Sequence, residues 1–130
     1  MTVMQMSHYE RLGGDQGVRR LVNRFYDLME SRPEAQGIRK MHAESLDGSR
    51  EKLYMFLSGW LGGPGLYIEK YGHPRLRARH LPFAIGEAER DAWMLCMSLA
   101  LDEMALEPML CDHLKQSLWK TADHMRNLAP

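Results

Sequence analysis

The chain has 130 residues, 45% of them hydrophobic, so we expect a single domain over residues 1–130 with one packed core. Seventeen Lys and Arg side chains balance seventeen Asp and Glu, which gives no electrostatic reason to expect nucleic acid or an anionic membrane as partner. No run approaches the ~18 to 20 apolar residues of a membrane span, and residues 1–8 lack the pattern of a secretion signal. We therefore expect a cytoplasmic protein, with residues 1–6 as a disordered extension.

The first helices are expected on either side of Gly13-Gly14. A short helix is predicted over 7–12. After the glycines, apolar residues recur at i, i+3, i+4, i+7, i+8 and i+11, which predicts a helix of about three turns that Pro33 ends soon afterwards. Its apolar face consists of Val18, Leu21, Val22, Phe25, Tyr26 and Met29.

The middle of the chain contains one long predicted helix and one short one. A helical period over 49–60 stops at the Gly-Gly-Pro-Gly run of 62–65, which cannot continue a helix. Residues 65–72 show no sustained period and are expected to form an irregular connection. Pro74 is suited to open a short helix that runs to about His80, and Pro82 closes it.

Two further helices complete an all-α class with about four main helices and several short ones. One begins at Glu87 and carries Trp93 and Met97 on one face, and Pro108 lies in the break or in the first turn of the last helix, 110–125. No stretch alternates with the period of two that a strand needs. Cys96 and Cys111 could form one disulfide, but both fall in apolar helical patterns, which favours reduced, buried thiols.

The chain has six histidines, but no two of them have HxxxH spacing and there is no CxxC, so a structural metal site is not expected. The sequence also has no phosphate-binding loop and no nucleophile elbow. The run 71–83, YGHPRLRARHLPF, brings two histidines and three arginines together in a short stretch. It could be a solvated basic helix. However, Leu76 and His80 share one helical face, with Arg75 and Arg79 beside them. That combination suits a ligand that is apolar in the middle and carries carboxylates at one edge.

At these residues the chain resembles the truncated haemoglobins of group II. The resemblance rests on 62–67 (GGPGLY), 71–83 and 89–97 (ERDAWMLCM), preceded in the right order by 9–14 (YERLGG) and 24–26 (RFY), and it covers about 8–128. It implies a two-over-two helical sandwich around haem b, in which the helices that carry Tyr26 and 49–60 stack across the last two. The glycine pairs 13–14 and 62–63 match places where this family needs unusual backbone angles.

The resemblance also assigns roles at the iron. His80 matches the proximal ligand, leaving the opposite axial position to a gas. Tyr26 and Trp93 match distal residues whose O–H and N–H can donate hydrogen bonds to a bound ligand. On the sequence alone, both would be ordinary core aromatics.

The rest of the pocket follows by position. Ser49 stands where many globins place a distal histidine, with Leu53 one turn later, so we expect an open side route to the iron. The pocket walls are assigned to Phe56 and Leu57 and, on the proximal side, to Leu76 and Phe83. The candidates for hydrogen bonds to the haem propionates are Arg79, Tyr67 and His73.

His42 departs from the family, which more often has Tyr or Phe there. It is either a polar stand-in at the haem edge or a third distal group, beside Tyr26 and Trp93, which would make that network respond to pH.

Three functions remain open. The first is a haem globin that reversibly binds oxygen, NO and CO, with slow oxygen release. The second is an enzyme of nitric oxide or peroxide detoxification, which needs a separate reductase because 130 residues hold no reductase domain. The third is a haem-based gas sensor. We expect a monomer or homodimer.

Overall fold

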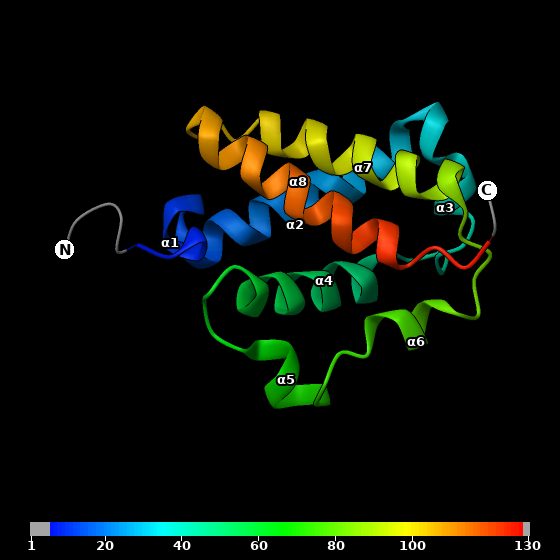
Figure 1. The fold of residues 1–130 in the computed structure, drawn as a ribbon, viewed down its shortest axis with the longest axis horizontal. Coiled ribbons are helices and arrows are strands. Elements are labelled where there is room, and N and C mark those ends of the chain that lie inside the picture. Colours follow the sequence, from blue (N-terminus) through cyan, green and yellow to red (C-terminus); the bar gives the residue numbers. More distant parts are fainter. Residues whose placement is uncertain (1–5, 129–130) are drawn as a thin grey trace.

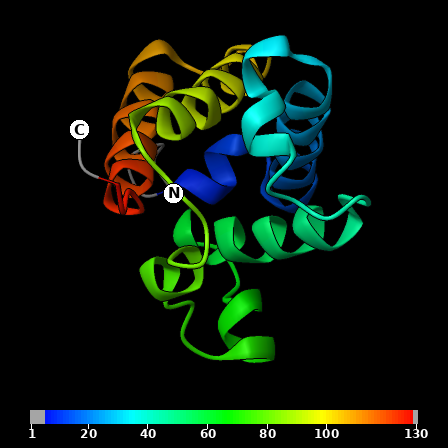
Figure 2. The same ribbon diagram turned by 90° about the vertical axis from the view of Figure 1, so that its right-hand side faces the viewer.

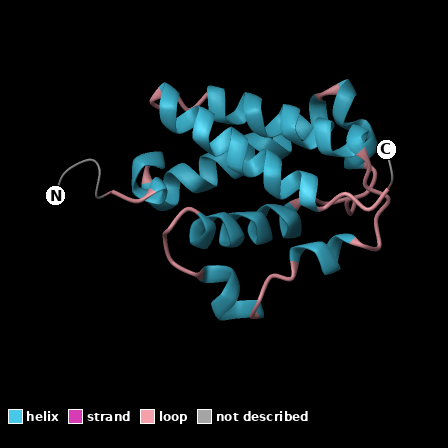
Figure 3. Ribbon diagram, viewed as in Figure 1, coloured by secondary structure: helices cyan, strands magenta, loops and turns pink. Residues whose placement is uncertain are grey.

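The computed structural model describes residues 6–128, and in that range every regular element is helical (Figure 3). This confirms the expected all-α class. The expected N-terminal extension, apart from Met6, lies outside the described residues. The elements are α1 (His8–Leu12), α2 (Gly14–Ser31), the 3-10 turn η2 (Pro33–Ala35), α3 (Gln36–Arg39), α4 (Asp47–Trp60), α5 (Leu66–Tyr71), α6 (Leu76–His80), α7 (Glu87–Asp102) and α8 (Pro108–His124).

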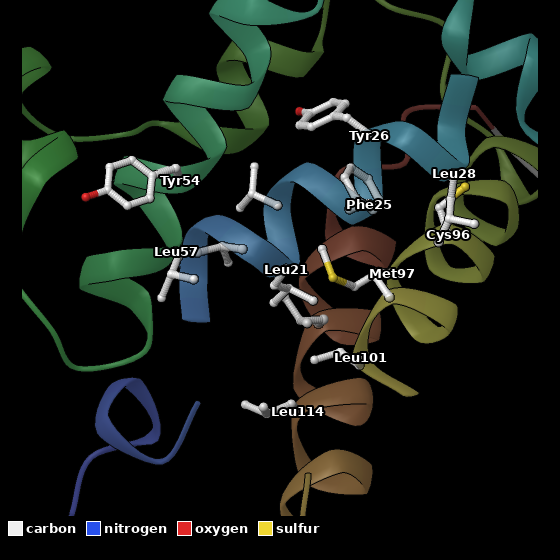
Figure 4. Packing of buried hydrophobic residues seen from close by; sticks show 14 of the residues in the cluster. Leu21, Phe25, Tyr26, Leu28, Tyr54, Leu57, Cys96, Met97, Leu101 and Leu114 are labelled. Carbon is white, nitrogen blue, oxygen red and sulfur yellow. The ribbon is translucent and has the colours of Figure 1, made fainter. Parts of the chain in front are cut away.

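Two helix pairs stack across one another, as the resemblance implied. Helix α2 packs against both α4 and α7, and α7 packs along α8 (Figure 1). Turning the molecule shows α4 crossing beneath the upper helices, with α5 and α6 below it (Figure 2). The core lies where α2, α7 and α8 meet and is filled by side chains that are almost wholly buried, among them Leu21, Phe25, Met97, Leu101 and Leu114 (Figure 4).

The corner between α1 and α2 shows why glycines are needed there. Ser7 caps α1 by accepting a hydrogen bond from the backbone N–H of Glu10. Gly13 then takes φ 111°, a left-handed conformation that L side chains rarely adopt. One turn into α2, a Cβ on Gly17 would collide with the carbonyl group of Leu12. The chain can therefore reverse tightly enough to begin α2 at Gly14, earlier than the apolar period alone predicted.

Two short segments differ from expectation. Residues 66–71 form α5, so the prediction of an irregular connection over 65–72 is wrong for these six residues. The helix is held by tertiary contact, since Tyr67 is buried and its ring lies edge-on to Phe56 of α4 at 6.5 Å. The turn η2 and helix α3 were also unexpected. Elements this short owe their stability to packing and have no measurable period.

Cys96 and Cys111 are buried free thiols, as predicted. Within residues 6–128, no helix combines the length and apolar character that crossing a membrane requires.

Candidate functional site

A cavity of about 560 Å³ opens among α2, α3, α4, α5, α6 and α7 and the end of α8. Its volume falls within the ~300–1,000 Å³ of ligand and cofactor sites. The cavity wall includes all the predicted site residues except His73: Tyr26, His42, Ser49, Leu53, Phe56, Leu57, Tyr67, Leu76, Arg79, His80, Phe83 and Trp93. Residues from five helices and two loops, far apart in sequence, thus surround one largely apolar space.

His80 presents one ring nitrogen to this cavity. Its Nδ1 lies 2.6 Å from the carbonyl oxygen of Leu76, one turn earlier on α6. Because a carbonyl only accepts, Nδ1 carries the proton and Nε2 keeps its lone pair. An imidazole whose other nitrogen donates to a carbonyl is the usual arrangement of a histidine metal ligand. Leu76 therefore supports His80 with its backbone and lines the cavity with its side chain.

Helix α6 is anchored by the end of the chain. None of its residues is buried, and Arg75, which precedes it, has φ 49°. Arg77 donates to the carbonyls of His124 (2.7 Å) and Arg126 (2.9 Å). The Asn127 amide donates to the carbonyls of Phe83 (2.7 Å) and His80 (3.3 Å) and accepts from the N–H of Ile85 (2.9 Å). We call residues 124–128 the C-terminal clasp. It binds Arg77 within α6 and the carbonyls and N–H of residues from His80 to Ile85, at and after the end of that helix.

The other side of the cavity presents two hydrogen-bond donors. Tyr26 comes from α2 and Trp93 from α7, and the wholly buried Phe25 contacts both rings at centroid distances of 4.8 and 5.0 Å. Figure 4 shows Tyr26 on the side of α2 away from Met97. Burial raises the pKa of the Tyr26 hydroxyl well above its usual range, and Arg50 opposes this only in part. The hydroxyl therefore stays protonated. Within residues 6–128, neither it nor the Trp93 indole N–H has a hydrogen-bond partner.

His42 lies beside Tyr26, with ring centroids 6.0 Å apart. Its Nδ1 is 2.8 Å from the carbonyl oxygen of Ile38, so Nδ1 is protonated and the neutral ring offers only an acceptor at Nε2. In this state His42 can accept a hydrogen bond from Tyr26 or a water. It gains a second donor only when the ring is protonated.

Three cavity residues, Arg79, Lys52 and Tyr67, carry a positive charge or a hydroxyl that can bind a carboxylate. Arg79 and Lys52 line the cavity, and neither forms an ion pair among the described residues. The Arg79 guanidinium lies 5.8 Å from the centre of the Tyr67 ring. His73 is elsewhere: it does not line the cavity, and its Nδ1 accepts from the backbone N–H of Arg75 at 3.0 Å. The structure thus gives His73 a local turn contact in place of a cavity position.

Sequence reasoning missed several wall residues. Lys52 had a usable signal, since it lies three residues after Ser49 and four before Phe56, on the same helical face. Arg90 lines the wall but is engaged by Asp91 and Asp123 at 2.9 and 2.7 Å. The remaining missed residues come mostly from α3 and its following loop, from α7 and from α8: Ile38, Met41, Ala43, Ile85, Glu89, Leu118, Thr121, Ala122 and Met125.

Comparison with known proteins agrees with this geometry. A family model described as bacterial-like globin matches residues 7–127. The chain is 40% identical over 119 residues to group 2 truncated hemoglobin YjbI of Bacillus subtilis, covering 92% of this chain and 87% of that protein. Among solved structures, it superposes on the group II 2-on-2 hemoglobin of Agrobacterium tumefaciens with a TM-score of 0.92 and 45% identity, covering 98% of each chain. The chain belongs to the group II truncated haemoglobins.

A cold-adapted truncated hemoglobin from the Antarctic bacterium Pseudoalteromonas haloplanktis is equally similar, with a TM-score of 0.93, 46% identity, and coverage of 95% of this chain and all of that one. Membership of this family makes the protein a haem globin that binds small ligands.

The residues of this truncated haemoglobin fit a haem. The cavity is lined by two imidazoles with an unprotonated Nε2, His80 on α6 and His42 beside Tyr26. It also offers apolar side chains for the porphyrin faces and two cations without ion pairs within residues 6–128 for its carboxylates. We assign His80 as the residue that would hold the iron. Phe56, Leu57, Leu76 and Phe83 would pack on the ring. Lys52, Arg79 and Tyr67 would hold the propionates.

Proposed function

We propose that this truncated haemoglobin reversibly binds dioxygen, together with NO and CO, beside Tyr26 and Trp93, and that it releases dioxygen slowly. The observation that carries the proposal is that two donors, the hydroxyl of buried Tyr26 and the indole N–H of partly buried Trp93, belong to residues that line the cavity and have no hydrogen-bond partner among the described residues. Haem, when bound at His80, supplies the coordination site for the diatomic ligand. The protein supplies the hydrogen bonds that retain it.

Each part of the wall has a task in this proposal. Phe25 holds the Tyr26 and Trp93 rings, so their donors are oriented before a ligand arrives. Neutral His42, as an acceptor, can direct the Tyr26 hydroxyl or compete with the ligand for its proton. Ser49 leaves the side of the cavity less obstructed than a long side chain would, which favours ligand entry past α4.

The experiment is a stopped-flow measurement of oxygen release from the haem-loaded protein, its Tyr26→Phe and Trp93→Phe variants, and the double variant. A net hydrogen bond contributes about 0.5–1.5 kcal/mol, so each single substitution should speed release by roughly 2- to 13-fold. Release of CO, which takes up less negative charge, should change less. Oxygen release that stays at the wild-type rate in the double variant would refute the proposal.

A second candidate function is detoxification. It has a peroxide branch, in which peroxide oxidises a substrate, and a nitric oxide branch, which needs an electron donor such as a separate reductase. The observation that favours the peroxide branch is a row of aromatic rings that leads from the cavity to the surface through Tyr67. Its test is peroxide consumption by the haem-loaded protein in the presence of a phenol. A rate no greater than that of free haemin would exclude this branch.

A further inference from the structure

Three aromatic rings form a continuous path between the haem cavity and solvent. Phe56 and Tyr67 both line the cavity and lie edge-to-face. Tyr67 in turn packs against Tyr71, four residues later on α5, with ring centroids 4.9 Å apart. Tyr67 is 8% exposed and Tyr71 39%. The path thus begins inside the molecule and ends on its surface.

We propose that Tyr71 is a surface site for the one-electron oxidation of anionic phenols, connected to the haem cavity through Tyr67. The proposal rests on the peroxide branch of the second candidate function. Of the other tyrosines, Tyr26 lines the cavity but is buried, and Tyr9 and Tyr54 do not line it. Tyr71 is therefore the tyrosine that combines exposure with direct contact to a cavity ring.

The charge around Tyr71 indicates the substrate class. The amino group of Lys70 lies 5.4 Å from the centre of its ring and is in no ion pair within residues 6–128, while that of Lys52, assigned above to a propionate, lies 5.8 Å from the same ring. Glu69 is the one acidic residue of α5, and residues 70–86, which follow it, contain four Lys or Arg and no Asp or Glu, although the whole chain has no net charge. Such a local excess of positive charge attracts anions and repels cations. A phenol that carries a carboxylate fits this surface.

The reaction balances with hydrogen peroxide as the oxidant. One hydrogen peroxide gains two electrons and two protons, its O–O bond breaks, and two waters form. The electrons and protons come from two phenol molecules, each of which loses one electron and its hydroxyl proton and becomes a neutral phenoxyl radical. Tyr71 passes through the same change: it loses an electron and a proton towards the cavity and regains both from the phenol. Without a phenol, two Tyr71 radicals on different molecules can couple through a new carbon–carbon bond. The hydrogen on each coupled ring carbon then moves as a proton to the phenol oxygen, which gives dityrosine.

The first experiment adds hydrogen peroxide to the ferric, haem-loaded protein without a phenol. We expect a tyrosyl radical signal by electron paramagnetic resonance, followed by dityrosine fluorescence and a covalent dimer whose linked peptides contain Tyr71. In Tyr71→Phe, the dimer should fall to the level seen without peroxide. Tyr9→Phe, which removes a partly exposed tyrosine away from the cavity, should keep it. A dimer that persists in Tyr71→Phe, or that maps to Tyr9 or Trp119, would overturn the proposal.

The second experiment compares two phenols of opposite charge, 4-hydroxyphenylacetate and tyramine. The wild type should oxidise the anion faster, and added salt and Lys70→Gln should both reduce that preference. Equal rates for the two phenols at low salt would contradict the assigned substrate class.

Carbon monoxide binding separates the possible failures. A Tyr71→Phe protein that takes up haem and binds CO as the wild type does shows that the change lies in the surface site. A wild type that binds CO and consumes peroxide without a Tyr71 radical overturns this inference alone. A wild type that consumes no peroxide overturns it together with the peroxide branch.

Discussion

At the scale of single residues, the hydrogen bond from His80 to the Leu76 carbonyl determines which nitrogen faces the cavity. His80→Gly should therefore lose haem faster than the wild type, with a spectrum that added imidazole restores, because imidazole can occupy the vacated space and bind the iron. The measurement is haem transfer to an excess of a haem-free acceptor globin, followed by absorption. His73→Ala is the matched control, since His73 does not line the cavity. Equal haem loss in both variants would count against the assignment.

His42 should influence ligand release in a pH-dependent way. While its ring is neutral, Nε2 only accepts, and protonation turns it into a second donor beside Tyr26. A protonated ring would offer this second donor to the bound ligand, so wild-type oxygen release should slow as the pH is lowered from about 8 to about 5. In His42→Phe this dependence should largely vanish. Stopped-flow release across the same range checks it, and matching profiles for the two proteins would show that His42 only packs at the edge.

At the scale of elements, the tight α1–α2 corner depends on Gly17. A methyl group there would meet the backbone carbonyl of Leu12, which cannot move aside as a flexible side chain could. Gly17→Ala should destabilise the protein by about 1–3 kcal/mol, the usual cost of overpacking. Gly37→Ala is the control, because a methyl group at that position would have no other atom within 4 Å beyond its own helix and chain neighbours. Urea denaturation of the haem-free protein measures both, and equal midpoints would mean that the corner can relax.

The long helices could be predicted from sequence and the short ones could not, for a physical reason. Over a long helix, the apolar period repeats often enough to stand out, as in the series from Val18 to Met29 on α2. Helix α5 has six residues, and what holds it is the contact between Tyr67 and Phe56, which are eleven residues apart and on different helices. Such contacts leave no local pattern.

At the scale of the whole molecule, His8 of α1 and His113 of α8 join elements from the two ends of the chain, with ring centroids 5.1 Å apart. Burial, followed by the charges of His113 and Arg11, lowers the pKa of His8 in the folded state. Between the folded and unfolded pKa values of His8, the unfolded chain binds more protons than the folded protein. The contribution to stability is therefore complete above the unfolded pKa and is lost as the pH falls from there through the lower folded pKa.

We therefore expect the free energy of unfolding to decrease from about pH 7.5 to about pH 5.5, because the unperturbed histidine pKa of about 6.5 lies between these two pH values. The decrease should be smaller in His8→Gln. His113→Gln should show part of the same effect, because His113 is a lesser cause of the shift. Urea denaturation at the two pH values provides the measurement. A His8→Gln protein with the full wild-type dependence would place its origin in other groups.

The candidate site likewise contains some residues that a local sequence pattern can reveal and others that only the folded structure can reveal. Almost every residue that the family motifs assigned to the site lines the cavity. Lys52 could have been found from its helical face. Asn127 could not, because its partners His80 and Phe83 lie 47 and 44 residues away and nothing in its neighbours indicates them.

The C-terminal clasp has a consequence for how this protein can be controlled. Its hydrogen bonds join residues 124–128 to the short helix that carries His80, so any molecule that binds those residues differently in the haem-loaded and haem-free states must change haem affinity. Thermodynamic reciprocity requires haem to change the affinity for that molecule by the same factor. The affinity for haem and the surroundings of residues 124–128 are thus thermodynamically linked through these hydrogen bonds.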